Sequence, residues 1–170
     1  MKIRILTLNL NNAGHRRFHV NSLARRELTD LDWNSPQDDL DATPGDVLLA
    51  VHTSYLHPIQ TLRAAGIAIH GLAHITGGGV VDNTPRILPE GMGVVLRRGT
   101  WPELPIFGLI QRLGSIPDDE MFHVFNMGLG MLVIVPPEQQ AQAMELLHGQ
   151  VYKVGEVVPG SRIVRIESGL

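Results

Sequence analysis

The residues best suited to chemistry in this chain lie between Ala73 and Gly91, where a histidine and a threonine precede three consecutive glycines. Glycine has no Cβ, so the backbone N–H groups of Gly77, Gly78 and Gly79 can adopt a positive φ and lie directly against a ligand. A helix that begins at such a turn directs its first N–H groups and the positive end of its dipole outward. The pattern predicts a strand, a glycine turn and a short helix that together bind an anion such as phosphate.

His74 is the first candidate for a catalytic residue, because an imidazole titrates near neutral pH and can donate to a phosphate oxygen or move a proton. Thr76 can donate its hydroxyl to the same phosphate. Structural interpretations stay open: His74 can bond to the backbone at a strand end, Thr76 can cap the turn, and the glycines can serve tight packing. A P-loop is excluded, since Val80 and Val81 stand where that motif has lysine and a hydroxyl residue.

A metal site is a further question, raised by three histidine pairs: His15/His19, His52/His57 and His70/His74. A spacing of four residues suits zinc only on a helix. His70 and His74 lie in an extended, glycine-containing stretch with no carboxylate nearby to act as a third ligand. We therefore expect no dedicated transition-metal site.

Composition narrows the class of protein. At 170 residues the chain has the length of a single domain, with 44% hydrophobic and 18% charged residues. Cysteine is absent, which excludes disulfides, thiolate metal sites and a cysteine nucleophile. The formal net charge of −3, without a block of basic residues, argues against nucleic acid as a partner. No segment approaches the length of a membrane span or of a signal peptide core, so we expect a cytoplasmic protein without a membrane partner.

Hydrophobic patterning predicts the elements that position these residues. We expect strands over residues 2–10, 67–72, 92–98, 128–135, 152–158 and 162–167. We expect helices over residues 23–31, 58–65, 105–113 and 138–148, and a further helix that begins at 117–120. Residues 46–55 fit a helix or a strand equally well, and 32–44 a surface loop. Helices and strands mix without strict alternation, so the expected fold is an α/β domain of the α+β type, a mixed sheet covered by helices.

Two long motifs resemble a known family. The run AHITGGG-VVDNTPRILPEG, followed by FNMGLGM at Phe125 to Met131, resembles the C-terminal domain of AIR synthetase, the phosphoribosylformylglycinamidine cyclo-ligase family of purine biosynthesis. The resemblance is strongest from about Ser54 to Ile166. It implies one family-like domain over residues 18–170, preceded by an atypical leader strand at 1–17.

The resemblance also implies roles for particular residues. It favours a catalytic role for His74 and substrate or phosphate binding at Thr76, Gly77, Gly78, Gly79 and Asn126. For Asn126 it implies a turn near the substrate cleft, and the alternative is a bulge at the start of a strand. His19 and Asn21 match a family motif near the substrate, although Val20 replaces its hydroxyl residue and its Gly-Tyr pair is missing. The alternative for these two is a plain N-cap neighbourhood.

The reaction implied for the whole enzyme uses ATP to phosphorylate the formyl amide oxygen of formylglycinamidine ribonucleotide, and the imidazole ring then closes with loss of phosphate. In the family, ATP and Mg²⁺ bind mainly in an N-terminal domain, whose Asp-Gly-Val-Gly-Thr-Lys-type motif is not in this sequence. We therefore expect the substrate-side half of a cyclo-ligase, inactive alone. Its expected partners are formylglycinamidine ribonucleotide, an AIR synthetase N-terminal domain and, in a homodimer, a second copy.

Two alternatives belong to other classes. One is an ATP-using relative with the same two-domain plan, such as selenophosphate synthetase, a hydrogenase maturation factor or thiamine-phosphate kinase. The PRILPEG and FNMGLGM runs argue against it. The other is a non-catalytic domain that binds a nucleotide-like anion or a partner chain.

Overall fold

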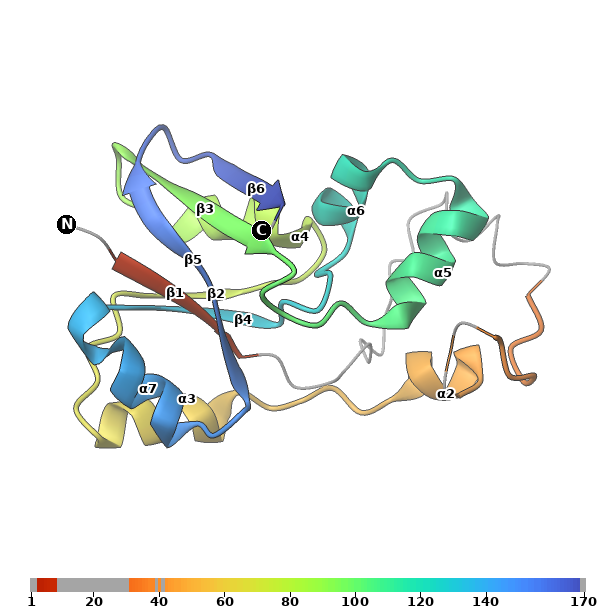
Figure 1. The fold of residues 1–170 in the computed structure, drawn as a ribbon, viewed down its shortest axis with the longest axis horizontal. Coiled ribbons are helices and arrows are strands. Elements are labelled where there is room, and N and C mark those ends of the chain that lie inside the picture. The colour runs from red at the N-terminus through yellow and green to blue at the C-terminus, as the bar shows by residue number, and fades with distance from the viewer. Residues whose placement is uncertain (1–2, 9–30, 39, 41, 169–170) are drawn as a thin grey trace.

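A single mixed sheet organises the chain. The computed structural model describes residues 3–8, 31–38, 40 and 42–168. In them, six strands lie in the order β2-β4-β1-β5-β3-β6 (Figure 1). The strands are β1 (Ile3–Leu8), β2 (Gly71–His74), β3 (Met92–Arg98), β4 (Met131–Val135), β5 (Val151–Pro159) and β6 (Val164–Ser168). Neighbouring strands are antiparallel except β3 and β6, which are parallel, so the expected mixed sheet is confirmed.

Helices cover both faces of this sheet, as the α/β prediction requires. The α-helices are α2 (Pro44–Leu49), α3 (Leu56–Ala64), α4 (Gly79–Asn83), α5 (Pro105–Gly114), α6 (Asp118–Val124) and α7 (Gln140–Leu146), and the 3-10 helices are η1 (Thr84–Ile87) and η2 (Pro137–Gln139). Helices α3 and α7 share one hydrophobic cluster with the sheet, whereas α4, α5 and α6 share the other (Figure 1).

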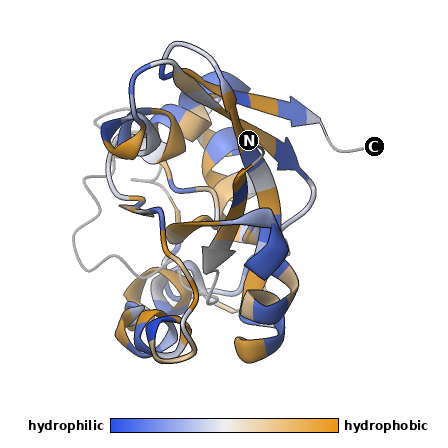
Figure 2. Ribbon diagram, turned by 90° about the vertical axis from the view of Figure 1, so that its left-hand side faces the viewer, coloured by the Kyte–Doolittle hydropathy of each residue, from blue (hydrophilic) through white to orange (hydrophobic). Residues whose placement is uncertain are grey.

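The central strands divide their side chains between these two clusters. On β4, Leu132 and Ile134 face the larger cluster, and Val133 and Val135 face the smaller one. Successive side chains of a strand point to opposite faces, so a strand covered on both sides needs a continuous apolar run. In Figure 2 the strands contain hydrophobic segments, and the helices carry both hydrophobic and hydrophilic residues. The expectation of a strand buried on both faces is confirmed for β4.

One predicted strand is displaced along the chain. The apolar run at 67–72 is not the strand itself, since β2 begins at Gly71 and continues to His74. The N–H of Ile67 donates to the carbonyl of Leu62 at the end of α3, and the N–H of Ala68 donates to the side chain of Gln139. These backbone groups are bonded elsewhere, so the strand ladder begins only after them.

The helix predicted over 138–148 is shorter than expected. It divides into η2 and the α-helix α7, because the N–H of Gln139 donates to the carbonyl of Pro136 at 3.1 Å and makes the first turn a 3-10 turn. His148, with φ 27°, and Gly149, with φ 69°, leave the helical region and end it.

The ambiguous segment 46–55 begins as a helix, since the Thr43 hydroxyl accepts the N–H of Asp46 and caps α2. Residues 23–30 of the helix expected over 23–31 lie outside the described residues.

Leu62 and Leu56 test the placement of α3, because they lie on the same helix with exposed fractions of 0% and 65%. Truncation of Leu62 to alanine leaves a cavity in the smaller cluster, so we expect the free energy of unfolding to fall by about 2–5 kcal/mol. The matched control Leu56→Ala should change it by less than about 0.5 kcal/mol. Urea denaturation followed by circular dichroism measures both, and equal losses would contradict this packing.

Candidate functional site

The glycine turn joins β2 to α4, as the sequence predicts, and its three glycines differ in environment. Gly77 is exposed, and a Cβ added there would meet nothing within 4 Å. Gly78 has φ 99°, in the left-handed region that favours glycine. Gly79 is buried, and a Cβ there would overlap the carbonyl oxygen of Phe122 on α6. The tight-packing interpretation therefore applies to Gly79, whereas Gly77 presents its backbone to solvent.

Asn83 holds the turn together and was missed by the sequence analysis. Its side chain is 5% exposed, and its Nδ2 donates to the carbonyl oxygen of Gly79 at 2.7 Å and more weakly to those of Thr76 and Gly77. The Thr76 hydroxyl donates to Asn83 Oδ1 at 3.3 Å. The sequence signal was an amide side chain four residues after Gly79, a spacing that places both on one side of a helical turn.

These bonds direct the carbonyl groups of the turn inward. The N–H of Gly79 donates to the carbonyl of Thr76 at 3.0 Å, and the N–H of Asp82 donates to that of Gly78 at 3.1 Å. Among the described residues, no acceptor is found for the N–H groups of Gly77 and Gly78. The arrangement leaves two adjacent backbone donors for an anion, and binding at Thr76 and the three glycines stays a prediction.

His74 ends β2, directly before the turn, and is exposed. The rings of His52 and Tyr55 surround it, at centroid distances of 5.7 Å and 5.8 Å. Partial burial lowers the pKa of His74, and the nearby charge of His52 lowers this pKa further. A neutral imidazole can accept a proton, so the environment suits a general base. The sequence pair His70/His74 is not a pair in space, because His70 precedes the opposite end of β2.

The FNMGLGM motif lies beside the glycine turn. The N–H of Ile75 donates to the carbonyl of Gly130 at 2.9 Å, which joins the two motifs directly. Within the second motif, Asn126 Oδ1 accepts the N–H of Gly128 at 3.1 Å. Asn126 therefore shapes a turn next to the candidate site, and its contact with substrate stays a prediction. His19 and Asn21 lie outside the described residues, so their predicted roles also stay predictions.

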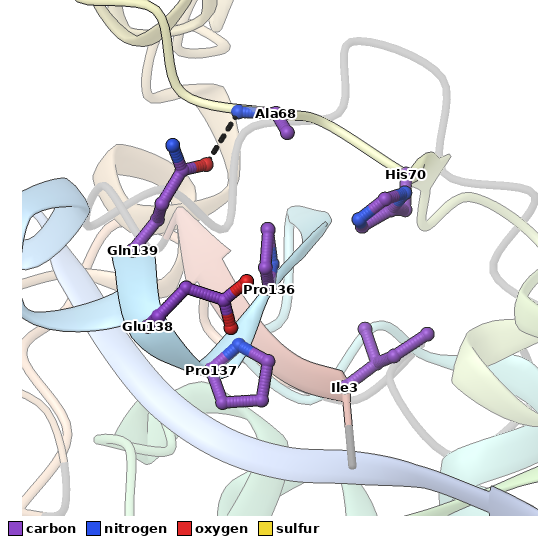
Figure 3. A pocket seen from close by; sticks show the side chains of 7 residues that line it. All are labelled: Ile3, Ala68, His70, Pro136, Pro137, Glu138 and Gln139. Carbon is purple, nitrogen blue, oxygen red and sulfur yellow. Dashed lines mark hydrogen bonds between the residues drawn. The ribbon is translucent and has the colours of Figure 1, made fainter. Parts of the chain in front are cut away.

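A pocket of about 400 Å³ opens near the other end of β2 (Figure 3). Its lining is Ile3, Ala68, His70, Pro136, Pro137, Glu138 and Gln139. None of the predicted site residues lines it. The Gln139 side chain crosses its edge to accept the N–H of Ala68 at 2.7 Å, so this part of the lining ties η2 to the segment that leads into β2.

Metal-ligating side chains do not gather in threes or more anywhere in the ranges that the structure describes. Of the helices in those ranges, none is both long enough and apolar enough to cross a membrane.

Comparison with solved structures defines the class of fold. The HypE–HypF complex superposes on 98% of this chain with a TM-score of 0.62 at 21% identity, and the match covers 49% of that chain. HypE in complex with ATP gives 0.62 at 15% identity, and T. maritima PurL complexed with FGAR gives 0.54 at 15%. At these identities the likeness shows the fold alone, an AIR synthase-like α/β domain that occurs within longer chains.

Sequence comparison then gives the family. The family described as AIR synthase related protein, C-terminal domain, matches residues 10–167, and the chain belongs to it. The phosphoribosylformylglycinamidine cyclo-ligases of Myxococcus xanthus (strain DK1622) and Geobacillus thermodenitrificans (strain NG80-2) are 44% and 40% identical to it. These matches cover 82% and 84% of this chain but 42% of each relative, so the chain spans less than half of their length. The family resemblance of the two motifs is confirmed.

Removal of the Asn83 side chain tests its role in the turn. Asn83→Ala deprives three backbone carbonyls of a donor inside the protein, so we expect the free energy of unfolding to fall by about 1–3 kcal/mol. The neighbouring exposed Asp82 supplies the control, and Asp82→Ala should cost less than about 1 kcal/mol. Urea denaturation measures both variants. Equal, small losses would show that Asn83 does not hold the turn.

The lowered pKa of His74 predicts a pH dependence. As the pH falls below the ordinary value of 6.5, the unfolded chain takes up the proton before the folded chain does. The stability that neutral His74 contributes is therefore present above this pH and lost below it. Between about pH 7.5 and about pH 5.5, the native chain should lose more stability than His74→Gln, measured by urea denaturation. An identical pH dependence in the two proteins would contradict the lowered pKa.

Proposed function

We propose that this chain is the substrate-side half of a phosphoribosylformylglycinamidine cyclo-ligase, which converts formylglycinamidine ribonucleotide to aminoimidazole ribonucleotide in purine biosynthesis in the cytoplasm. The observation that carries the proposal is the bond from Ile75 to Gly130. This bond joins the segment between His74 and Gly77 to the second family motif, so the two family-like runs lie side by side. The identities of 44% and 40% to enzymes of that name support the same assignment.

The chemistry suits these groups. An amide oxygen leaves only after it has been activated, and ATP supplies the phosphoryl group that activates it. The adjacent N–H groups of Gly77 and Gly78 would bind phosphate oxygens, where negative charge must be stabilised. Neutral His74 would accept the proton that the amidine nitrogen loses as it attacks the formyl carbon and phosphate departs. His19, Asn21 and Asn126 are assigned to substrate binding in the same proposal.

A separate N-terminal domain would complete the enzyme. The chain spans 42% of each relative, and the family's acidic ATP-binding motif is not in its sequence. We therefore assign ATP and Mg²⁺ mainly to that domain and expect this chain to be inactive without it. Mg²⁺ would neutralise charge on the transferred phosphoryl group.

A second candidate function is non-catalytic binding of a partner chain, and one observation favours it. Leu49, Val51 and Leu56 have exposed fractions of 78%, 74% and 65% within one short segment. Exposed apolar side chains that gather on a surface mark interaction sites. The same segment suits contact with the N-terminal domain of a cyclo-ligase, and the experiment that separates the two functions is a chimera.

A chimera separates them. In it, this chain replaces the matching C-terminal segment of the M. xanthus cyclo-ligase, and ATP-dependent formation of aminoimidazole ribonucleotide is assayed. We expect activity from the chimera and none from this chain alone. His74→Gln should lower kcat by roughly 10²–10⁴-fold, the usual contribution of a general base. The control His57→Gln, at an exposed position of α3, should leave kcat unchanged.

Calorimetric titration with formylglycinamidine ribonucleotide accompanies the assay. A folded chimera that neither binds this nucleotide nor forms product would favour the non-catalytic candidate, the binding of a partner chain. Product formation by this chain alone would contradict the need for a second domain.

A further inference from the structure

Three rings meet beside the candidate site, although their residues are spread over two segments of the sequence. His52 precedes α3, Tyr55 is the residue before its first turn, and His74 ends β2. The centroid distances are 5.7 Å for His52 to Tyr55, 5.7 Å for His52 to His74 and 5.8 Å for Tyr55 to His74. Tyr55 meets both imidazoles edge-on, at interplanar angles of 77° and 64°. The contacts form a closed triangle, which we call the ring triangle.

Gly130 fixes the Tyr55 corner of this triangle. A Cβ at Gly130 would overlap the Tyr55 hydroxyl and lie 2.7 Å from its Cζ. Gly130 has no positive φ, so its backbone conformation does not demand glycine. The missing side chain therefore serves the close approach of the phenol ring. The carbonyl of Gly130 also accepts the N–H of Ile75, so Tyr55 rests on the strand segment that orders the backbone next to His74.

The burial of Tyr55 also holds its ring in this position. Tyr55 is half-buried and packs against the smaller hydrophobic cluster, which anchors α3 to the sheet. Burial also raises the pKa of Tyr55, so the phenol stays neutral near pH 7. A neutral, packed ring covers part of the His74 imidazole without adding charge.

We propose that Tyr55 is a positioning residue for His74, and that the ring triangle holds the imidazole in one orientation and in its neutral form. The proposal rests on the proposed function in one respect, since it assumes that His74 transfers the proton. Among the described residues, the titratable groups whose rings contact His74 are His52 and Tyr55, and the facing residue of β4 is the uncharged Met131. Burial, to which the Tyr55 ring contributes, and the nearby charge of His52 both disfavour the imidazolium form of His74.

Titration of the His74 imidazole by NMR in the 170-residue chain tests the proposal without an activity assay. Tyr55→Ala removes the covering ring, and His52→Gln removes the neighbouring charge. Gly130→Ala keeps the tyrosine at position 55 but displaces its ring, because the added Cβ occupies the position of the phenol. Each should raise the pKa of His74 toward its ordinary value. Tyr55→Phe retains the ring and should leave this pKa close to that of the native chain. His57→Gln is the control, and it should leave the pKa unchanged.

Tyr55→Ala and Gly130→Ala both remove the Tyr55 ring from its place beside His74, so the test does not depend on a single variant. If Tyr55→Ala does not fold, Gly130→Ala reports on the same contact. A folded Tyr55→Ala or Gly130→Ala variant in which the His74 pKa does not move overturns the proposal. Gly130→Ala should destabilise the native chain, because the added Cβ meets the Tyr55 ring. The same substitution made in the Tyr55→Ala variant meets no ring, so it should not destabilise that variant further. Equal destabilisation in both backgrounds overturns the contact.

The chimera supplies the functional readout. Tyr55→Ala should lower kcat by about 10–100-fold with a smaller effect on KM, since a misplaced base slows the chemical step more than binding. Tyr55→Phe should restore most of the rate. A His74 pKa that moves while kcat stays constant overturns the positioning role. A chimera that is inert even with Tyr55 in place contradicts the proposed function instead, and the NMR result then still decides whether Tyr55 controls His74.

Discussion

The pairing of β2 with β4 is the contact on which the rest of the candidate site depends. β2 is a four-residue strand at one edge of the sheet, and its register places Gly71 opposite Ile134 and His74 opposite Met131. A strand this short gains little from its own ladder, so its position is set by a partner buried on both faces. The bond from Ile75 to Gly130 continues the pairing one residue beyond His74. The glycine turn therefore starts from a fixed backbone, and both family motifs share that base.

The turn itself depends on inward polar bonds. Helix α4 has five residues, and so short a helix is not stable by its intrinsic propensity. The Asn83 amide satisfies carbonyl groups of the turn, and the absence of a Cβ at Gly79 lets α4 approach the backbone of α6. Because the carbonyl groups point inward, the N–H groups of Gly77 and Gly78 remain on the outer side. The same hydrogen bonds therefore hold the turn in place on its inner side and leave the N–H groups of Gly77 and Gly78 accessible on its outer side.

Much of this was predictable from the sequence, for physical reasons. Strands β3 and β4 have the apolar runs that burial requires, and the order of residues from His74 to Gly79 specifies a strand, a turn and a helix. The start of β2 was not predictable, because the N–H groups of Ile67 and Ala68 bond to α3 and to Gln139, which are tertiary contacts. Spacing likewise paired His74 with His70, whereas the fold pairs it with His52. The periodicity of a sequence reports local structure and does not predict which loop packs against the end of a strand. The ring triangle was therefore visible only in the folded structure.

Exposure explains why such a site would need a second surface under the proposed function. His52, His74 and Gly77 are all exposed to solvent. Water weakens the interaction of two charges at 4 Å to about 1 kcal/mol, whereas the same pair at a protein surface of lower effective dielectric interacts with about 4 kcal/mol. Donors that face water therefore stabilise a developing phosphate charge only slightly, and enclosure by another domain would strengthen every bond that this chain supplies. The chain spans 42% of each of the two cyclo-ligases compared above, which leaves ample length in those enzymes for such a domain. Under the proposed function, the N–H groups of Gly77 and Gly78 and the His74 imidazole would form one wall of a cleft, and a second domain would exclude water from it.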